Sequence, residues 1–253
     1  MSLLDDLRSY AWRKITWDKL FQGDALFTEL KALPISELPQ AIQQIHTCQQ
    51  TLPNRLPADL WQTANAVLTC AEIASLDRYT IPGLPALLAK IDPSAPAFEV
   101  DSDLDAQTWP AYLRQRLGQI AWPAQTGPSW GWDTVTCFWK KQRPAESSQR
   151  ITLLLLDERE QGMTAELFLE LLQDGRGTLY PDPETMSFVS LKDSFQESLR
   201  EAVRLAQAQD VWPGERDIRW RIERQDGRPL TALDGGSAGG AYALGLLKLL
   251  VQA

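Results

Sequence analysis

The residues Asp234-Gly-Gly-Ser-Ala-Gly-Gly240 stand directly before a long apolar run, Ala241–Val251. Glycines followed by such a run predict a tight loop that opens a helix. At a helix start, unpaired backbone N–H groups and the helix dipole favour negative charge, and glycines allow close approach to the backbone. Ser237 in this loop can attack a carbonyl while the N–H groups stabilise the oxyanion, or it can act only as a helix cap.

The composition is that of a folded protein, and it excludes several classes of function. The chain has 253 residues, of which 44% are hydrophobic, and its net charge of −8 argues against nucleic acid and anionic membranes as partners. An apolar stretch of membrane-spanning length and a signal-peptide core are both missing, so we expect a cytoplasmic protein. Three cysteines without a C-x-x-C pair and a single histidine, His46, argue against a disulfide framework and a metal site, and we expect no cofactor.

Residues 1–120 are expected to be helical and to form a partner-binding or regulatory region. Their apolar residues recur at helical spacing between prolines, and Ser36 is a candidate N-cap. The segment 93–105 is typical of a linker, and a further helix is expected over residues 104–120. The apolar residues that predict helices are Trp12, Trp17, Leu20, Phe27, Leu38, Ile42, Ile45, Leu60, Ala64, Val67, Leu68 and Ala71.

Residues 121–253 mix strand and helix signals, which predicts an α+β fold. Near-alternation of aromatic and β-branched residues predicts a strand over Trp130–Trp139, followed by a loop over residues 140–149. The apolar runs Ile151–Leu156 and Leu167–Leu172 predict buried strands, with a turn at 174–177. A helix is expected after Ser190, and a strand over residues 217–222 with arginines outward. The apolar stripe of the helix and the inward residues of the strand are Leu191, Phe195, Leu199, Ala202, Val203 and Ala206, and Ile218, Trp220 and Ile222.

Two common explanations of the glycine loop do not fit the sequence. Gly235-Gly-Ser-Ala-Gly239 has the G-x-S-x-G form of a nucleophile elbow, but residues 238–253 contain no Asp, Glu or His to complete a triad. A Walker A loop needs Lys-Ser or Lys-Thr after the glycines, and neither follows. Another type of phosphate-binding glycine loop stays open.

A stretch of about a third of the chain, residues 167–250, resembles the first part of the proteolytic domain of Lon-type proteases. Residues 177–191 and 196–202 are similar to the approach to that domain's first helix and to the helix itself. Residues 217–222 resemble the strand before the active-site loop. Asp234–Gly239 resembles the signature Asp-Gly-Pro-Ser-Ala-Gly, with Gly236 in place of the proline.

The resemblance implies that Ser237 is the nucleophile of a serine–lysine dyad acting on a peptide or protein substrate. The oxyanion or substrate loop would then be Asp234, Gly235, Gly236, Ala238 and Gly239. In the family the lysine lies a few dozen residues after the serine, so we expect a chain truncated before the lysine and inactive by itself. Lys248 would lie roughly 16 Å along the helix from Ser237, too far to act as base, and no motif supports Lys140, Lys141 or Lys192.

The alternative is a non-catalytic interaction or adaptor module in which the Gly-Gly-Ser loop is structural. Asp234 is then an acid favoured by the helix dipole. The two hypotheses differ in what Ser237→Ala should remove: proteolysis under the first, and almost nothing under the second.

Overall fold

The computed structural model describes residues 25–51, 60–77, 79–95, 97–100, 104–123, 129–156, 162–209, 212 and 214–252. Its helices and mixed sheet confirm the predicted α+β class. The chain divides into two compact units, one of residues 1–102 and 115–142 and the other of residues 103–114 and 143–253. The helical unit therefore continues to residue 142, beyond the expected boundary at 120. No helix in the described part of the chain is long and apolar enough to cross a membrane.

The first unit consists of helices packed around helix α5. Helix α5 contacts α3, α4, α6 and α8, and its buried residues Ala64, Val67 and Ala71 follow the predicted helical spacing. Ser36 is not an N-cap, because it lies inside the 3-10 turn η1. The predicted turns around Trp12, Trp17 and Leu20 lie outside the described residues. The helices are α3 (Ala25–Ala32), η1 (Ile35–Glu37), α4 (Leu38–Thr51), α5 (Leu60–Ala74), η2 (Ile81–Gly83), α6 (Leu84–Ile91), α7 (Trp109–Leu117, shared with the second unit) and α8 (Trp130–Gln142).

The strand predicted over Trp130–Trp139 is wrong, because these residues form helix α8. Eight of its first ten residues are buried, and the exposed residues Asp133, Lys140 and Lys141 form only a narrow polar stripe, so the sequence shows no clear helical period. Burial overrides the intrinsic preference of aromatic and β-branched residues for strands. A Cβ on Gly131 would lie only 1.9 Å from the Trp122 ring, so glycine permits this packing. The loop predicted over 140–149 is also wrong, since those residues end α8 and begin strand β1 (Ala145–Leu156).

The second unit is built on a four-stranded sheet of order β1-β2-β5-β3. Strand β2 is antiparallel to both of its neighbours, β1 and β5, and β3 is parallel to β5. A small parallel sheet joins β4 to β6. The elements are β1 (Ala145–Leu156), β2 (Gly162–Leu172), β3 (Leu179–Pro181), α9 (Pro183–Met186), β4 (Ser190–Leu191), α10 (Asp193–Gln207), β5 (Ile218–Arg224), β6 (Ala232–Leu233) and α11 (Gly239–Gln252).

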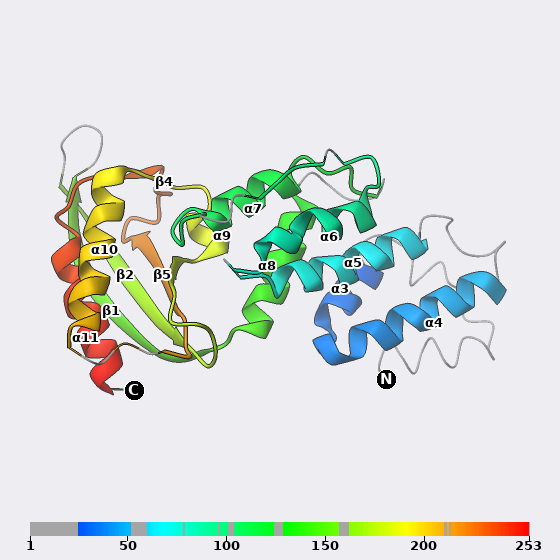
Figure 1. Ribbon diagram of the computed structural model, residues 1–253, viewed down its shortest axis with the longest axis horizontal. Coiled ribbons are helices and arrows are strands. Elements are labelled where there is room, and N and C mark those ends of the chain that lie inside the picture. The colour runs from blue at the N-terminus through cyan, green and yellow to red at the C-terminus, as the bar shows by residue number, and fades with distance from the viewer. Residues whose placement is uncertain are drawn as a thin grey trace. The chain divides into compact units, whose positions relative to one another are not determined.

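Helices α10 and α11 lie side by side against one face of this sheet (Figure 1). Gly245 allows α11 to approach closely, since a Cβ there would lie 2.6 Å from Leu169 Cδ1 and 2.7 Å from Ile151 Cδ1. This core confirms the alternation of β5 and the predicted helical stripe from Phe195 onward, whereas Leu191, predicted as the first residue of that stripe, lies in strand β4. Its buried residues include Leu167, Leu169, Leu171, Phe195, Leu199, Ala202, Ala206, Ile218, Trp220, Ile222, Tyr242, Leu246 and Leu249.

Strand β1 is an edge strand, which corrects its prediction as a fully buried one. Within the described residues it pairs only with β2. Leu153 points into the core and is 4% exposed, whereas Leu154 and Leu156 are 81% and 71% exposed on the other face. The continuous apolar run therefore supplies one buried face and one exposed face.

Candidate functional site

The small β4–β6 sheet brings the serine loop to the first turn of α10. The Ser190 N–H donates to Thr231 O (2.9 Å), and the Lys192 N–H donates to Leu233 O (3.0 Å). Since Lys192 directly precedes α10 and Leu233 directly precedes Asp234, this pairing joins the start of α10 to the loop. Residues 234–239, which end at the first residue of α11, are called the Ser237 loop below.

Asp234 and Ser194 form a closed set of hydrogen bonds with the backbone of Gly235. The Ser194 hydroxyl donates to Asp234 Oδ1. The Gly235 N–H donates to Ser194 Oγ (2.9 Å) and to Asp234 Oδ1 (2.6 Å). These hydrogen bonds from Ser194 and Gly235, with the charge of Lys192, hold the pKa of Asp234 below its usual range. Asp234 is thus more than an acid favoured by the helix dipole, because its hydrogen bond with Ser194 fixes the loop to α10.

Ser237 is exposed in the turn that opens α11. Its hydroxyl makes no hydrogen bond to any residue that the structure describes. Ala238 is buried in the core and anchors the end of the loop. The Gly239 N–H donates to Gly236 O (3.2 Å), which closes the turn. The hydroxyl is therefore presented to solvent by a loop fixed on both sides.

The structure explains why two positions of the loop are occupied by glycine. Gly235 has φ +83°, a left-handed conformation that favours glycine. A Cβ on Gly239 would lie 3.2 Å from both Cβ and O of Ser198 on α10. Gly236, which stands where the Lon signature has proline, would meet open space with an added Cβ. The predicted site residues thus lie together in one loop.

A base for Ser237 is not found among the described lysines. None of them hydrogen-bonds to Ser237 in the described part of the chain. Lys192 is exposed and its charge acts on Asp234. Lys248 is on α11, nine residues after the helix begins at Gly239, which is roughly 14 Å along the axis. Lys140 and Lys141 are in the last turn of α8. The loop by itself offers an exposed serine hydroxyl and helix-start N–H groups.

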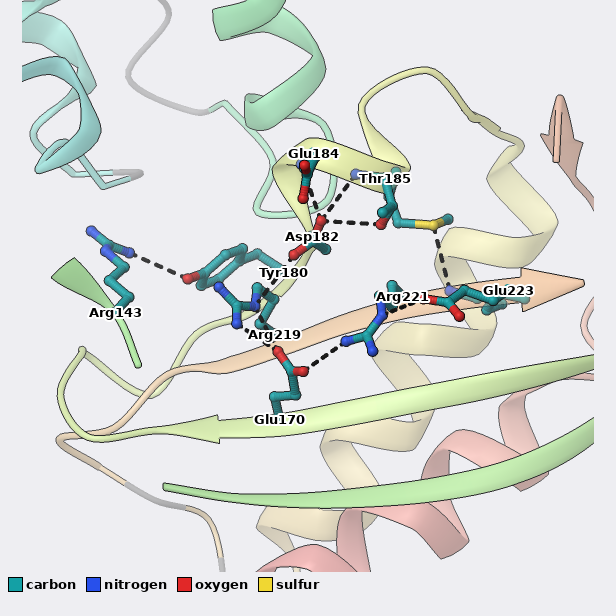
Figure 2. Close-up of polar contacts among 11 residues, drawn as sticks. Arg143, Glu170, Tyr180, Asp182, Glu184, Thr185, Arg219, Arg221 and Glu223 are labelled. Atoms are coloured by element: carbon teal, nitrogen blue, oxygen red, sulfur yellow. Dashed lines mark hydrogen bonds and ion pairs between the residues drawn. The ribbon is translucent and has the colours of Figure 1, made fainter. Parts of the chain in front are cut away.

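A second polar cluster lies on the other face of the sheet, where arginines were expected to point into solvent (Figure 2). Arg219 is only 8% exposed. Its Nε and Nη2 donate to Glu170 Oε2 at 2.8 and 2.6 Å, and Arg221 Nη1 donates to Glu170 Oε1 at 2.7 Å. Burial acts to raise the pKa of Glu170, but the hydrogen bonds and charges of the two arginines outweigh it and lower that pKa.

Two further carboxylates of this unit, those of Asp182 and Asp217, hold turns in place. Asp182 caps helix α9 by accepting the N–H groups of Glu184 and Thr185. Asp217 Oδ1 accepts the N–H groups of Arg176 (2.8 Å) and Thr178 (2.9 Å). These contacts give Glu170, Asp182 and Asp217 structural roles in pairing and capping.

Sequence reasoning found the loop but missed Ser194. The hydrogen bond between Ser194 and Asp234 joins residues 40 apart in the chain, and only the pairing of β4 with β6 reveals it. Among the described residues, no group of three or more His, Cys, Asp or Glu side chains could hold a metal ion. No protein-family model and no curated protein sequence matches the chain.

Proposed function

We propose that this chain carries the nucleophile loop of a Lon-like serine peptidase, with Ser237 as the nucleophile. The observation that carries the proposal is the exposed Ser237 hydroxyl at the start of α11, in a loop held by Asp234. The order of helix α10, strand β5 and serine loop agrees with the order that the Lon resemblance predicts. A cytoplasmic location and a peptide or protein substrate belong to the same proposal.

In the proposed reaction, Ser237 Oγ attacks the carbonyl carbon of a peptide bond and a lysine takes its proton. Backbone N–H groups of residues 236–239 hold the negative oxygen of the tetrahedral intermediate. The intermediate collapses, the C–N bond breaks and the amine leaves with the lysine's proton. Water then hydrolyses the acyl-enzyme and restores Ser237. Since no described lysine contacts Ser237, we expect the isolated chain to turn over peptides very slowly.

Covalent capture tests this proposal without requiring full turnover. A peptide boronic acid accepts a serine oxygen and forms a tetrahedral anion that resembles the intermediate. We expect a tetrahedral boron signal by ¹¹B NMR and an adduct at Ser237 by mass spectrometry. Ser237→Ala should abolish both. Ser148→Ala is the matched control, since Ser148 is an exposed serine on β1. Equal binding by wild type and Ser237→Ala would rule out the nucleophile.

A non-catalytic interaction module is the second candidate. The observation that favours it is that Ser237 lacks a hydrogen-bonded base within the described residues. Under this hypothesis Ser237→Ala leaves stability and partner binding almost unchanged, and the boronic acid does not label the loop. Peptide hydrolysis that disappears in Ser237→Ala would exclude it.

A further inference from the structure

Few side chains from outside the Ser237 loop hold it in place. Ser237 and Gly236 are exposed, and Ser237 Oγ has no hydrogen-bond partner in the described ranges. Among the side chains that the structure describes, only that of Ser194 hydrogen-bonds to the loop from outside it. The conformation of the loop therefore depends on how Ser194 engages Asp234 and Gly235.

One face of α10 contacts the loop at two points. The N-cap of α10, Lys192, makes no side-chain capping bond, and Ser194 in the first turn turns its hydroxyl to the loop. One turn later, Ser198 packs against Gly239, while its own hydroxyl donates to Phe195 O (2.7 Å). Residues four apart share a helix face. Ser194 thus bonds to the loop near Gly235, and Ser198 packs where the loop meets α11.

Ser194 acts on the backbone conformation of Gly235. The positive φ of Gly235 is one of several conformations open to a glycine. Its N–H is accepted both by Ser194 Oγ and by Asp234 Oδ1, and the Ser194 hydroxyl in turn donates to the same carboxylate oxygen. Hydrogen bonds to a charged carboxylate are stronger than neutral ones. The three groups therefore select one conformation two residues before Ser237.

We propose that Ser194 is a positioning residue for Ser237: its hydroxyl fixes the conformation of Gly235 and thereby the place of Ser237 at the start of α11. The catalytic meaning of that placement rests on the proposed function, but the effect on the loop does not. Ser194 touches no reacting group and acts only through Asp234 and Gly235.

The loop itself provides the first test, by NMR on the full chain. We expect Ser194→Ala to speed hydrogen exchange of the Gly235 amide about tenfold and to raise the pKa of Asp234 in a carboxyl ¹³C titration. Ser194→Thr keeps the hydroxyl and should restore both values. Ser198→Ala is the matched control, because its hydroxyl bonds within α10. Lys192, whose charge also acts on Asp234, is unchanged in every variant.

The second readout is the affinity of the peptide boronic acid. We expect Ser194→Ala to weaken it about tenfold and Ser194→Thr to leave it near wild type. Unchanged Gly235 exchange and Asp234 titration in Ser194→Ala would overturn the proposal, as would unchanged affinity where wild type forms the Ser237 adduct. If wild type forms no adduct, the peptidase function fails, and exchange and titration alone decide the role of Ser194.

Discussion

At the residue scale, two features of the structure favour glycine at position 175: an unusual backbone conformation and a close neighbour. Its φ is +148°, and a Cβ there would lie 2.3 Å from Asp217 Cγ. The same Asp217 carboxylate accepts the N–H groups of Arg176 and Thr178. Gly175→Ala must therefore strain the backbone and displace a carboxylate that holds the turn before β3.

We expect Gly175→Ala to lower the free energy of unfolding by about 2 to 4 kcal/mol, measured by urea denaturation. Gly227→Ala is the matched control. Gly227 has φ +71°, but an added Cβ there would face open space. Gly227→Ala should therefore lose only about 1 kcal/mol of unfolding free energy, from backbone strain. Equal losses in the two variants would show that the contact with Asp217 contributes nothing.

Glu170 links two arginines and gives the second unit a dependence on pH. The pKa of Glu170 is lowered in the folded protein, where Arg219 and Arg221 donate to its carboxylate and outweigh burial. The folded state therefore binds fewer protons than the unfolded chain. Ionised Glu170 contributes fully to stability above the unfolded-state pKa of about 4.3. This contribution is lost as the pH falls through the lower folded-state pKa of Glu170.

Glu170→Gln should lower the free energy of unfolding at pH 7 by about 2 to 4 kcal/mol, because it leaves Arg219 buried with a weaker partner. The loss should shrink as the pH is lowered past the point where wild-type Glu170 is protonated. Glu223 also pairs with Arg221 but is half exposed, so Glu223→Gln should cost less than about 1 kcal/mol. A loss for Glu170→Gln that is the same at every pH would contradict this account.

At the element scale, strand β1 separates its leucines between two environments. Leu153 is buried against the core, and its neighbour Leu154 is exposed. Leu153→Ala should cost about 2 to 4 kcal/mol of unfolding free energy, whereas Leu154→Ala should cost less than about 0.5 kcal/mol. Urea denaturation measures both. A large loss at Leu154 would mean that the outer face of β1 is covered in solution.

The elements that sequence analysis predicted are those with one buried face. Helix α10 and strand β5 each carry a single apolar stripe, so Phe195 and Leu199, or Ile218 and Trp220, recur with a clear period. Helix α8 exposes only a narrow stripe at Asp133, Lys140 and Lys141, and its wide buried face obscures the helical period. The burial of Arg219 was also not predicted, because its partner Glu170 lies 49 residues away in the sequence.

The same distinction applies to the candidate site. The Ser237 loop is local in sequence, and its glycines and following apolar run are enough to predict a loop that opens a helix. Ser194 shows no such local pattern, because its role arises only when β4 pairs with β6. The exposed outer face of β1 was missed for a related reason, since an apolar run does not reveal whether a second neighbour covers the strand.

At the scale of the whole molecule, the chain has two compact units, each with buried residues of its own. Ile73 on α5 is fully buried in the helical unit, and Leu199 on α10 is 1% exposed in the α+β unit. Units with separate cores can unfold in separate transitions, in which case a single two-state description does not apply. We therefore expect two transitions in scanning calorimetry.

Each core variant should move one of these transitions. Ile73→Ala and Leu199→Ala should each cost about 2 to 4 kcal/mol, which lowers the midpoint of the affected unit by on the order of 10 °C. The midpoint of the other unit should stay in place, so each variant serves as the control for the other. If both variants lower a single midpoint together, the two cores unfold as one cooperative structure. In that case destabilising the helical unit would also expose the Ser237 loop to unfolding, and the helical region would become part of what maintains the site.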